Sequence, residues 1–131
     1  MDGIYKIRGK DLFRGNTTVV EIPDVAIIID KNRNIWGLEE DLAKAFIGSY
    51  EGDIGTSIIP GTDYIIIYDK RSVLEMYGHR FIPYDCIIMK STDKGLKGIS
   101  ADEIDDVRRA YRNRTANYQL GLVTVLAYKI S

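Results

Sequence analysis

Hydrophobic and polar residues follow two periods along this chain, one typical of strands and one typical of helices. Residues 4–8 alternate with a period of two, which predicts a strand with one exposed face. Uninterrupted apolar or β-branched runs predict further strands at residues 17–22, 25–29, 63–68, 85–90 and 117–130, the last being one long strand. A polar turn cluster at residues 30–34 makes residues 17–37 a hairpin or meander.

Two segments carry the helical period. Apolar residues recur on one face of residues 38–47, and Gly48 suits the end of that helix. The second helix begins at Ser100, a natural N-cap, with Glu103 at the capping-box position. One stripe of this helix is apolar and is expected to face the core: Ile104, Val107 and Tyr111.

The remaining segments favour loops and turns. Glycine and proline punctuate residues 49–62, glycine punctuates residues 91–99, and residues 72–77 suit a short helix. A loop as long as residues 49–62 is unusual in a compact domain and often carries function; here it either lines a pocket or covers an edge strand. The fold predicted is α+β, with about six mostly antiparallel strands packed against two main helices in a single domain, residues 1–131.

Composition changes this picture mainly by exclusion. No apolar run exceeds five residues, which is too short to cross a bilayer, and the N-terminus lacks the apolar core of a signal peptide. A single cysteine, Cys86, excludes an internal disulfide framework, and a single histidine, His79, excludes a His-rich metal cluster. We therefore expect a cytoplasmic protein without a metal or cofactor. Because the net charge is −1, any anion site must be local.

The order of charges along the second helix is its least random feature. Acidic residues occupy the first turns and arginines the last: Asp102, Glu103, Asp105 and Asp106, then Arg108, Arg109, Arg112 and Arg114. Such an order complements the helix dipole, at roughly 0.3–1 kcal/mol per charge, so a solvated helix face also explains it.

Two details favour an anion site instead. The cations are all Arg, whose planar fork grips phosphate bidentately, although Lys is equally frequent in the chain. Arg108 and Arg112 are one turn apart and repel each other, as neighbours of like charge do, and Arg109 and Asn113 have the same spacing. A diphosphate between Arg108 and Arg112 would turn that repulsion into a clamp.

Several aromatic residues near turns could support a nucleobase, although packing in the core is the more common role: Trp36, Tyr50, Phe81, Tyr84 and Tyr118. Stacking a base on such a ring contributes about 1–3 kcal/mol. Phe81 is the best candidate, because it stands beside Arg80 and before Pro83 in a segment too broken for a central strand. Ser91 and Thr92 could supply hydroxyl and backbone donors to a ligand.

Catalytic signals are absent from the sequence. His79 follows a glycine in a turn, with no nucleophile motif beside it, and Cys86 lies in an apolar run that suits a buried, inert thiol. We therefore expect no catalytic residues and no enzyme activity.

These features together resemble the phage anti-Thoeris proteins of the first described type, which act as sponges for cyclic ADP-ribose isomers. The resemblance spans most of the chain and rests on its length, the α+β layout, Phe81 between strands, and the arginine-bearing helix 102–114 followed by the C-terminal strand.

The resemblance implies a specific function and specific contacts. Such proteins bind glycocyclic ADP-ribose at a dimer interface without cleaving it, and they can assemble further and hold cyclic oligonucleotides at separate sites. Carried over by position, Phe81 would stack the adenine, and Arg108 and Arg112 would hold the diphosphate. Where the resemblance leads us to expect Asn near the base, this chain offers Ser91 or Thr92. A homodimer or higher homo-oligomer in the cytoplasm of a phage host is implied.

Two other functions stay open on the sequence alone. The same arginines, residues 108–114, could bind a phosphate backbone in a phage-type inhibitor or nucleic-acid-binding module. The chain could also cleave a cyclic nucleotide through His79, although no motif supports this.

Overall fold

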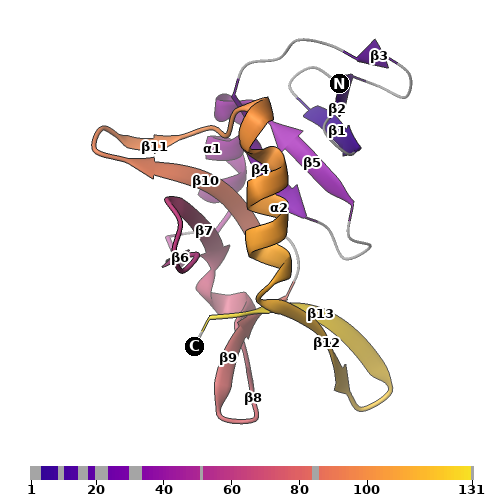
Figure 1. The fold of residues 1–131 in the computed structure, drawn as a ribbon. Coiled ribbons are helices and arrows are strands. Elements are labelled where there is room, and N and C mark those ends of the chain that lie inside the picture. Colours follow the sequence, from indigo (N-terminus) through magenta and orange to yellow (C-terminus); the bar gives the residue numbers. More distant parts are fainter. Residues whose placement is uncertain are drawn as a thin grey trace.

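The computed structural model contains two antiparallel sheets and two α-helices (Figure 1). It describes residues 4–8, 11–14, 18–19, 24–29, 34–50, 52–83 and 86–130. The fold class predicted from the sequence, α+β with a mostly antiparallel sheet and two main helices, is confirmed. The strands are more numerous than the six or so expected, because segments predicted as loops or as a short helix contain strands and residues 117–130 form two. No helix in this part of the chain is long and apolar enough to span a membrane.

The larger sheet runs in the order β3-β2-β1-β5-β4-β10-β7-β6, and β11 pairs with β10 outside this path. Its strands, in chain order, are β1 (Ile4–Arg8), β2 (Asp11–Arg14), β3 (Thr18–Val19), β4 (Ala26–Ile29), β5 (Ile35–Leu38), β6 (Ile54–Ile58), β7 (Tyr64–Asp69), β10 (Cys86–Thr92) and β11 (Gly95–Lys97). The predicted strand at residues 17–22 is described only at β3, and its remainder lies outside the described residues.

The smaller sheet has the order β12-β13-β9-β8. Its strands are β8 (Leu74–Met76), β9 (His79–Ile82), β12 (Thr115–Leu120) and β13 (Val123–Lys129). The two hairpins of this sheet diverge away from the body of the molecule in Figure 1, because β13 pairs with β9 only at Tyr128 and Lys129.

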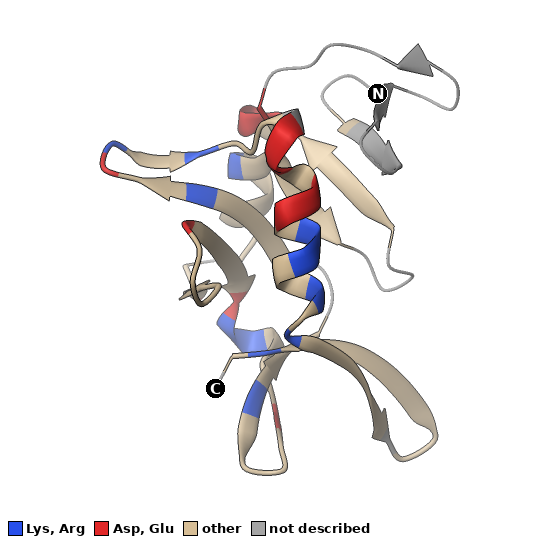
Figure 2. Ribbon diagram, in the orientation of Figure 1, with Lys and Arg blue, Asp and Glu red and all other residues tan. Residues whose placement is uncertain are grey.

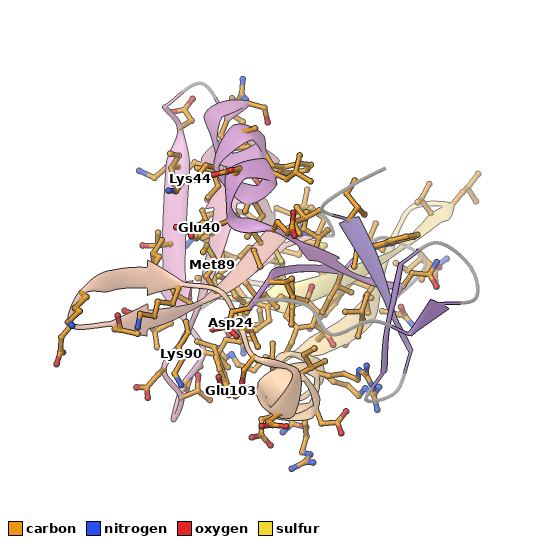
Figure 3. The ribbon with its side chains drawn as sticks, turned by 90° about the horizontal axis from the view of Figure 1, so that it is seen from above. Asp24, Glu40, Lys44, Met89, Lys90 and Glu103 are labelled. Atoms are coloured by element: carbon orange, nitrogen blue, oxygen red, sulfur yellow. The ribbon has the colours of Figure 1, made fainter. Side chains whose placement is uncertain are left out.

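The larger sheet lies between the two helices (Figure 3). Helix α1 (Glu40–Gly48) covers one face and α2 (Ile104–Arg112) covers the other. A 3-10 turn at Ala101–Glu103 leads into α2, and another, at Lys70–Ser72, joins β7 to β8. Alternate residues of β4 face opposite ways. Ile28 packs in the cluster of buried apolar side chains beneath α1, and Ile27 and Ile29 pack in the cluster beneath α2. The uninterrupted apolar run thus predicted correctly a strand buried on both faces.

The start of α2 is tied to the sheet through Glu103. Its carboxylate accepts hydrogen bonds from Lys90 Nζ at 2.7 Å, from the Ser100 hydroxyl at 2.8 Å and from the Tyr64 hydroxyl at 3.3 Å. The predicted capping partners therefore meet, but the Ser100 hydroxyl donates to the carboxylate, and the Glu103 N–H is accepted by the Ser100 carbonyl oxygen at 3.0 Å. The predicted apolar stripe of α2 is buried, as expected: Ile104, Val107 and Tyr111.

These contacts shift the pKa values of the residues that make them. The hydrogen bond from Lys90 lowers the pKa of Glu103, and the same bond raises the pKa of Lys90. Burial, followed by the charge of Glu103, raises the pKa of Tyr64 to about 12. The phenol of Tyr64 therefore keeps its proton, and its hydrogen bond to Glu103, to a higher pH than an ordinary tyrosine would.

Four segments differ from the sequence prediction. Residues 117–130 are not one long strand, because a turn at Gly121, with φ of 61°, divides them into β12 and β13. The predicted loop 49–62 contains β6, and the predicted loop 91–99 contains the end of β10 and all of β11. Residues 72–77 are not a helix, since they include β8 and lead into a turn where Tyr77 and Gly78 both have positive φ, the signature of a tight hairpin.

Candidate functional site

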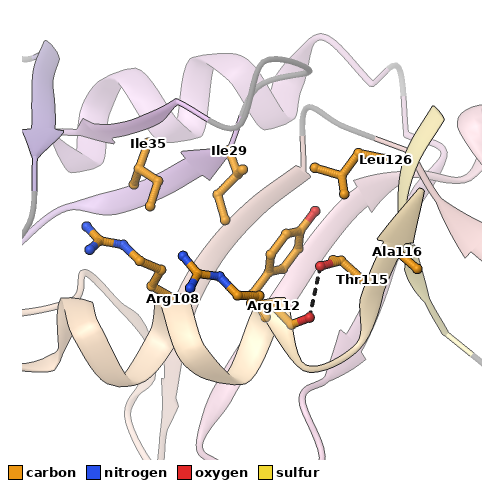
Figure 4. Close-up of a pocket in the computed structure, with 8 residues that line it drawn as sticks. Ile29, Ile35, Arg108, Arg112, Thr115, Ala116 and Leu126 are labelled. Atoms are coloured by element: carbon orange, nitrogen blue, oxygen red, sulfur yellow. Dashed lines mark hydrogen bonds between the residues drawn. The ribbon is translucent and has the colours of Figure 1, made fainter. Parts of the chain in front are cut away.

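A cavity of about 300 Å³ lies between α2, the β4–β5 pair and the β12–β13 hairpin (Figure 4). The described residues that line it come from all three places: Ile29, Ile35, Arg108, Tyr111, Arg112, Thr115, Ala116 and Leu126. Elements far apart in the sequence therefore enclose one space, which opens to solvent beside α2.

Arg108 and Arg112 present two positive charges to this cavity. They lie one turn apart on α2, and in Figure 4 their guanidinium groups extend beneath Ile35 and Ile29. Arg108 Nη1 is 3.4 Å from Asp105 Oδ1. Among the described residues, no carboxylate lies within 4.0 Å of the Arg112 guanidinium. The basic half of α2, which follows its acidic first turn, is visible in Figure 2.

The rest of the wall is apolar and rigid. Ile29, Ile35 and Leu126 line it with aliphatic side chains. Tyr111 is held from behind, because its ring stacks on that of Tyr128 with 5.3 Å between centroids and an interplanar angle of 18°. The Cys86 thiol also donates to the Tyr111 hydroxyl at 3.9 Å. Charges facing such a wall are less screened than charges in water.

The C-terminal end of α2 is joined to the β12–β13 hairpin. The Thr115 hydroxyl donates to the Arg112 carbonyl oxygen at 3.0 Å, the bond drawn in Figure 4. Arg114 Nη2 donates to the carbonyl oxygen of Lys129 at 2.9 Å. Its guanidinium carbon also lies 5.6 Å from the centre of the Tyr128 ring, a cation–π distance. The end of α2 that carries Arg112 is therefore fixed against the hairpin.

Of the predicted site residues, the structure brings Arg108 and Arg112 together at this cavity. Arg109 lies on another flank of the helix, where its side chain is 73% exposed and its Nη1 lies 4.0 Å from Asp106 Oδ1. Arg109 borders a separate hollow with Asn113 and Arg114, on the side of the turn that joins β6 to β7. The two flanks of α2 thus carry their cations on different surfaces.

Phe81 is placed differently from the sequence interpretation. It lies on β9, which pairs with β13 on one side and β8 on the other, so its segment is a central strand and not a broken one. Its side chain is 2% exposed and packs against Tyr118, with 4.5 Å between ring centroids. Phe81 does not line the arginine cavity.

Ser91 and Thr92 lie near the tip of the β10–β11 hairpin and do not line the cavity either. The Thr92 hydroxyl donates to the Gly95 carbonyl oxygen at 2.8 Å and accepts from the backbone N–H of Lys94 at 3.3 Å, which stabilises the turn. The structure therefore does not gather these two hydroxyl residues with the arginines.

The other aromatic candidates are dispersed. Tyr50 is buried against the α1 cluster and Trp36 is half-buried on β5, and neither lines the arginine cavity. Tyr84 lies outside the described residues. His79 is exposed at the β8–β9 turn. Cys86 is buried, as its apolar surroundings in the sequence indicated.

Sequence reasoning did not identify Tyr111, Thr115 and Leu126 as cavity residues. Tyr111 was assigned only to the core stripe. Thr115 lies just after the end of α2 in the chain, and Leu126 approaches the helix because the chain folds back at Gly121, a turn hidden inside a run of apolar residues. An apolar residue after the glycine, Leu122, conceals the usual turn composition.

Comparisons of this chain with protein-family models, with curated proteins and with solved structures find no match.

Proposed function

We propose that this protein binds a cyclic ADP-ribose isomer at the cavity beside α2 and withholds it uncleaved, thereby inhibiting bacterial Thoeris defence. The observation that carries the proposal is that Arg108 and Arg112, chosen from the sequence as a diphosphate clamp, border the same cavity. The resemblance to anti-Thoeris proteins supplies the identity of the ligand.

The energetics suit a clamp of this kind. A sponge works near stoichiometry and needs nanomolar affinity, about −12 kcal/mol. Hydrogen bonds to charged groups contribute about 1.5–3 kcal/mol each, and each guanidinium offers more than one donor to phosphate. The ligand would also relieve the repulsion between the two arginines, which the helix spacing imposes.

The size of the cavity limits which part of the ligand it holds. Sites for small molecules usually measure about 300–1,000 Å³, so this cavity lies at the lower end of that range. The diphosphate and an adjoining ribose would occupy the space between the arginines and the aliphatic wall. The adenine would extend toward the open side, since Phe81 is buried elsewhere.

The lining supports binding without cleavage. Of the eight described residues around the cavity, none carries a carboxylate, an imidazole or a thiol that could act as a general base. The one hydroxyl on α2, that of Tyr111, is already engaged by Cys86.

The placement of the other arginines favours a small ligand over a nucleic-acid backbone. Arg109 borders a different hollow, and Arg114 is engaged with the Lys129 carbonyl and the Tyr128 ring. A phosphate backbone would be served best by cations on one continuous surface.

Calorimetric titration with a cyclic ADP-ribose isomer tests the proposal. The R108A/R112A variant should lose at least about 100-fold in affinity, since two charge-assisted contacts are removed. The matched control is R109A, which removes the same charge from the same helix but outside the cavity, and it should bind within about twofold of the wild type. Equal affinities of the wild type and R108A/R112A would contradict the proposal.

Two further measurements separate the alternatives. Heating the complex and weighing the released ligand by mass spectrometry should return the intact mass, whereas a hydrolysed product would indicate an enzyme. Titrations at increasing salt should give a shallow slope; a fall in log K of about 0.7–0.9 per phosphate over many phosphates would instead indicate a nucleic-acid backbone. A parallel titration with a cyclic oligonucleotide shows whether that ligand class binds as well.

A further inference from the structure

Strand β6 forms one end of the larger sheet, and among the described residues it pairs only with β7 (Figure 1). Two backbone bonds fix which groups of β6 point toward β7. The Ile59 N–H donates to the Tyr64 carbonyl at 2.9 Å, and the Asp53 carbonyl accepts from the Lys70 N–H at 2.8 Å. Because bonded pairs alternate along an antiparallel ladder, odd-numbered residues of β6 face β7. The N–H and C=O groups of the even-numbered residues therefore point outward: Ile54, Thr56 and Ile58.

The side chains of these same three residues lie together on one face. They stand opposite Asp69, Ile67 and Ile65 of β7, and the latter two pack in the cluster beneath α1. Ile54 is 38% exposed and Ile58 is 58% exposed. Edge strands usually carry charges or proline that discourage pairing, but residues 54–58 contain neither.

The body of the strand is held in place from its other face. A Cβ atom on Gly55 would lie 2.4 Å from the ring of Tyr68, so that ring packs directly on the glycine backbone. Tyr68 is itself buried in the cluster beneath α2. The outer edge of β6 is thus presented on a fixed strand.

We propose that β6 pairs antiparallel with β6 of a second copy of this chain, about a twofold axis at Thr56. The sequence is self-complementary about that residue, because Ile54 of each copy falls opposite Ile58 of the other. The hydrogen-bond alternation fits the same axis: the outward groups of Thr56 meet those of the second Thr56, and each Ile54–Ile58 pair exchanges two bonds as well. Isologous contacts of this kind close a dimer.

The pairing would join two sheets into one and would cover apolar surface. In each copy the exposed isoleucines lie on the α1 face, where Phe46 is also exposed. Helix α2 and its cavity lie on the opposite face, so the dimer leaves the cavity open. The inference therefore does not depend on the identity of the ligand.

A pair of double variants tests the register. In I54K/I58K, the register places lysine opposite lysine at both pairs, and the dimer dissociation constant should rise about tenfold or more. In I54K/I58E, lysine faces glutamate across the axis, and the dimer should persist. The two variants differ only at residue 58, and residues 54 and 58 of one strand are too far apart to pair with each other, about 13 Å. Sedimentation equilibrium across a concentration series measures all three proteins, with circular dichroism as the check of folding.

Each outcome decides the proposal. A wild-type dimer that dissociates in I54K/I58K and persists in I54K/I58E supports it. A monomeric wild type, a dimer unaffected by I54K/I58K, or loss of the dimer in both variants overturns it. If I54K/I58K does not fold, T56P replaces it, because the Thr56 N–H points outward and is not needed by β7, with T56V as the control that keeps the amide.

Discussion

Lys90 Nζ lies 2.7 Å from Glu103 Oε2, and this contact ties the start of α2 to the middle of the larger sheet (Figure 3). Both side chains are partly buried, with Lys90 34% exposed and Glu103 24% exposed. Arg108 follows Glu103 by little more than one turn. The contact that anchors the helix therefore also sets where its cationic side chains meet the cavity.

The first prediction concerns this anchor. E103Q should lower the thermal midpoint at neutral pH by about 3–6 °C, because the carboxylate accepts three hydrogen bonds in the folded state. The matched control is E40Q, which removes an exposed ion pair to Lys44 at 3.2 Å on α1 and should shift the midpoint by less than about 2 °C. Calorimetric melting of both variants checks the difference.

The same anchor predicts an acid dependence. The folded-state pKa of Glu103 is lowered, so its stabilisation is present above the unfolded pKa of about 4.3 and is lost as pH falls through the folded value. The wild type should therefore lose its advantage over E103Q between about pH 5 and pH 3. The pKa of Lys90 is raised, so its contribution to stability has the opposite pH dependence and is lost as the pH rises above about 10.4. A constant difference between the two proteins across the acid range would contradict this assignment.

The second prediction concerns the aliphatic wall. Ile35 lies above the Arg108 side chain in Figure 4, so I35E should place a carboxylate among the two guanidinium groups and compete with any anionic ligand. We expect affinity to fall by about tenfold or more in I35E. I35Q, of nearly the same shape without the charge, should retain most of the binding. Similar losses in both variants would show that shape, rather than charge, governs the site.

The third prediction concerns the cost of the clamp without its ligand. Arg112 makes no ion pair with a described carboxylate and stands one turn from Arg108. R112A should therefore change the free energy of unfolding of the ligand-free protein by no more than about 0.5 kcal/mol, even though it weakens ligand binding. Denaturant unfolding with and without ligand separates these two effects. A large loss of stability in the ligand-free variant would assign Arg112 a structural role instead.

The fourth prediction compares two glycines. A Cβ on Gly55 would fall 2.4 Å from the Tyr68 ring, and G55A should cost about 1–3 kcal/mol through overpacking. G48A is the control, because a Cβ there would meet nothing within 4 Å and alanine favours the helix. It should be neutral or slightly stabilising. Equal effects of the two substitutions in denaturant unfolding would contradict the packing described for β6.

The local periodicity of apolar residues was sufficient to predict the buried strands and α2. A continuous apolar run such as residues 25–29 is stable only as a strand buried on both faces. An apolar stripe such as Val107 and Tyr111 is stable only when that one face of the helix is buried. The arginine pair was also predictable, because side chains at i and i+4 must share a helix face whatever lies opposite.

The remainder depended on long-range packing. Nothing local distinguishes Phe81 as a stacking surface from Phe81 as a core residue, and only the pairing of β9 with β13 decides that it is buried. Leu122 occupies a hairpin turn although it is apolar, and it is completely exposed there. A prediction that treats every apolar residue as buried therefore joins β12 and β13 into one strand.

The single thiol of this chain lies at the boundary between the sheet and α2. Cys86 has no exposed surface and contacts the Tyr111 hydroxyl, so an alkylating reagent can reach it only after the helix lifts from the sheet. Because the chain has no second cysteine, the rate of alkylation measures how often α2 opens from the sheet. A ligand bound between α2 and the aliphatic wall should therefore lower the rate at which Cys86 is alkylated.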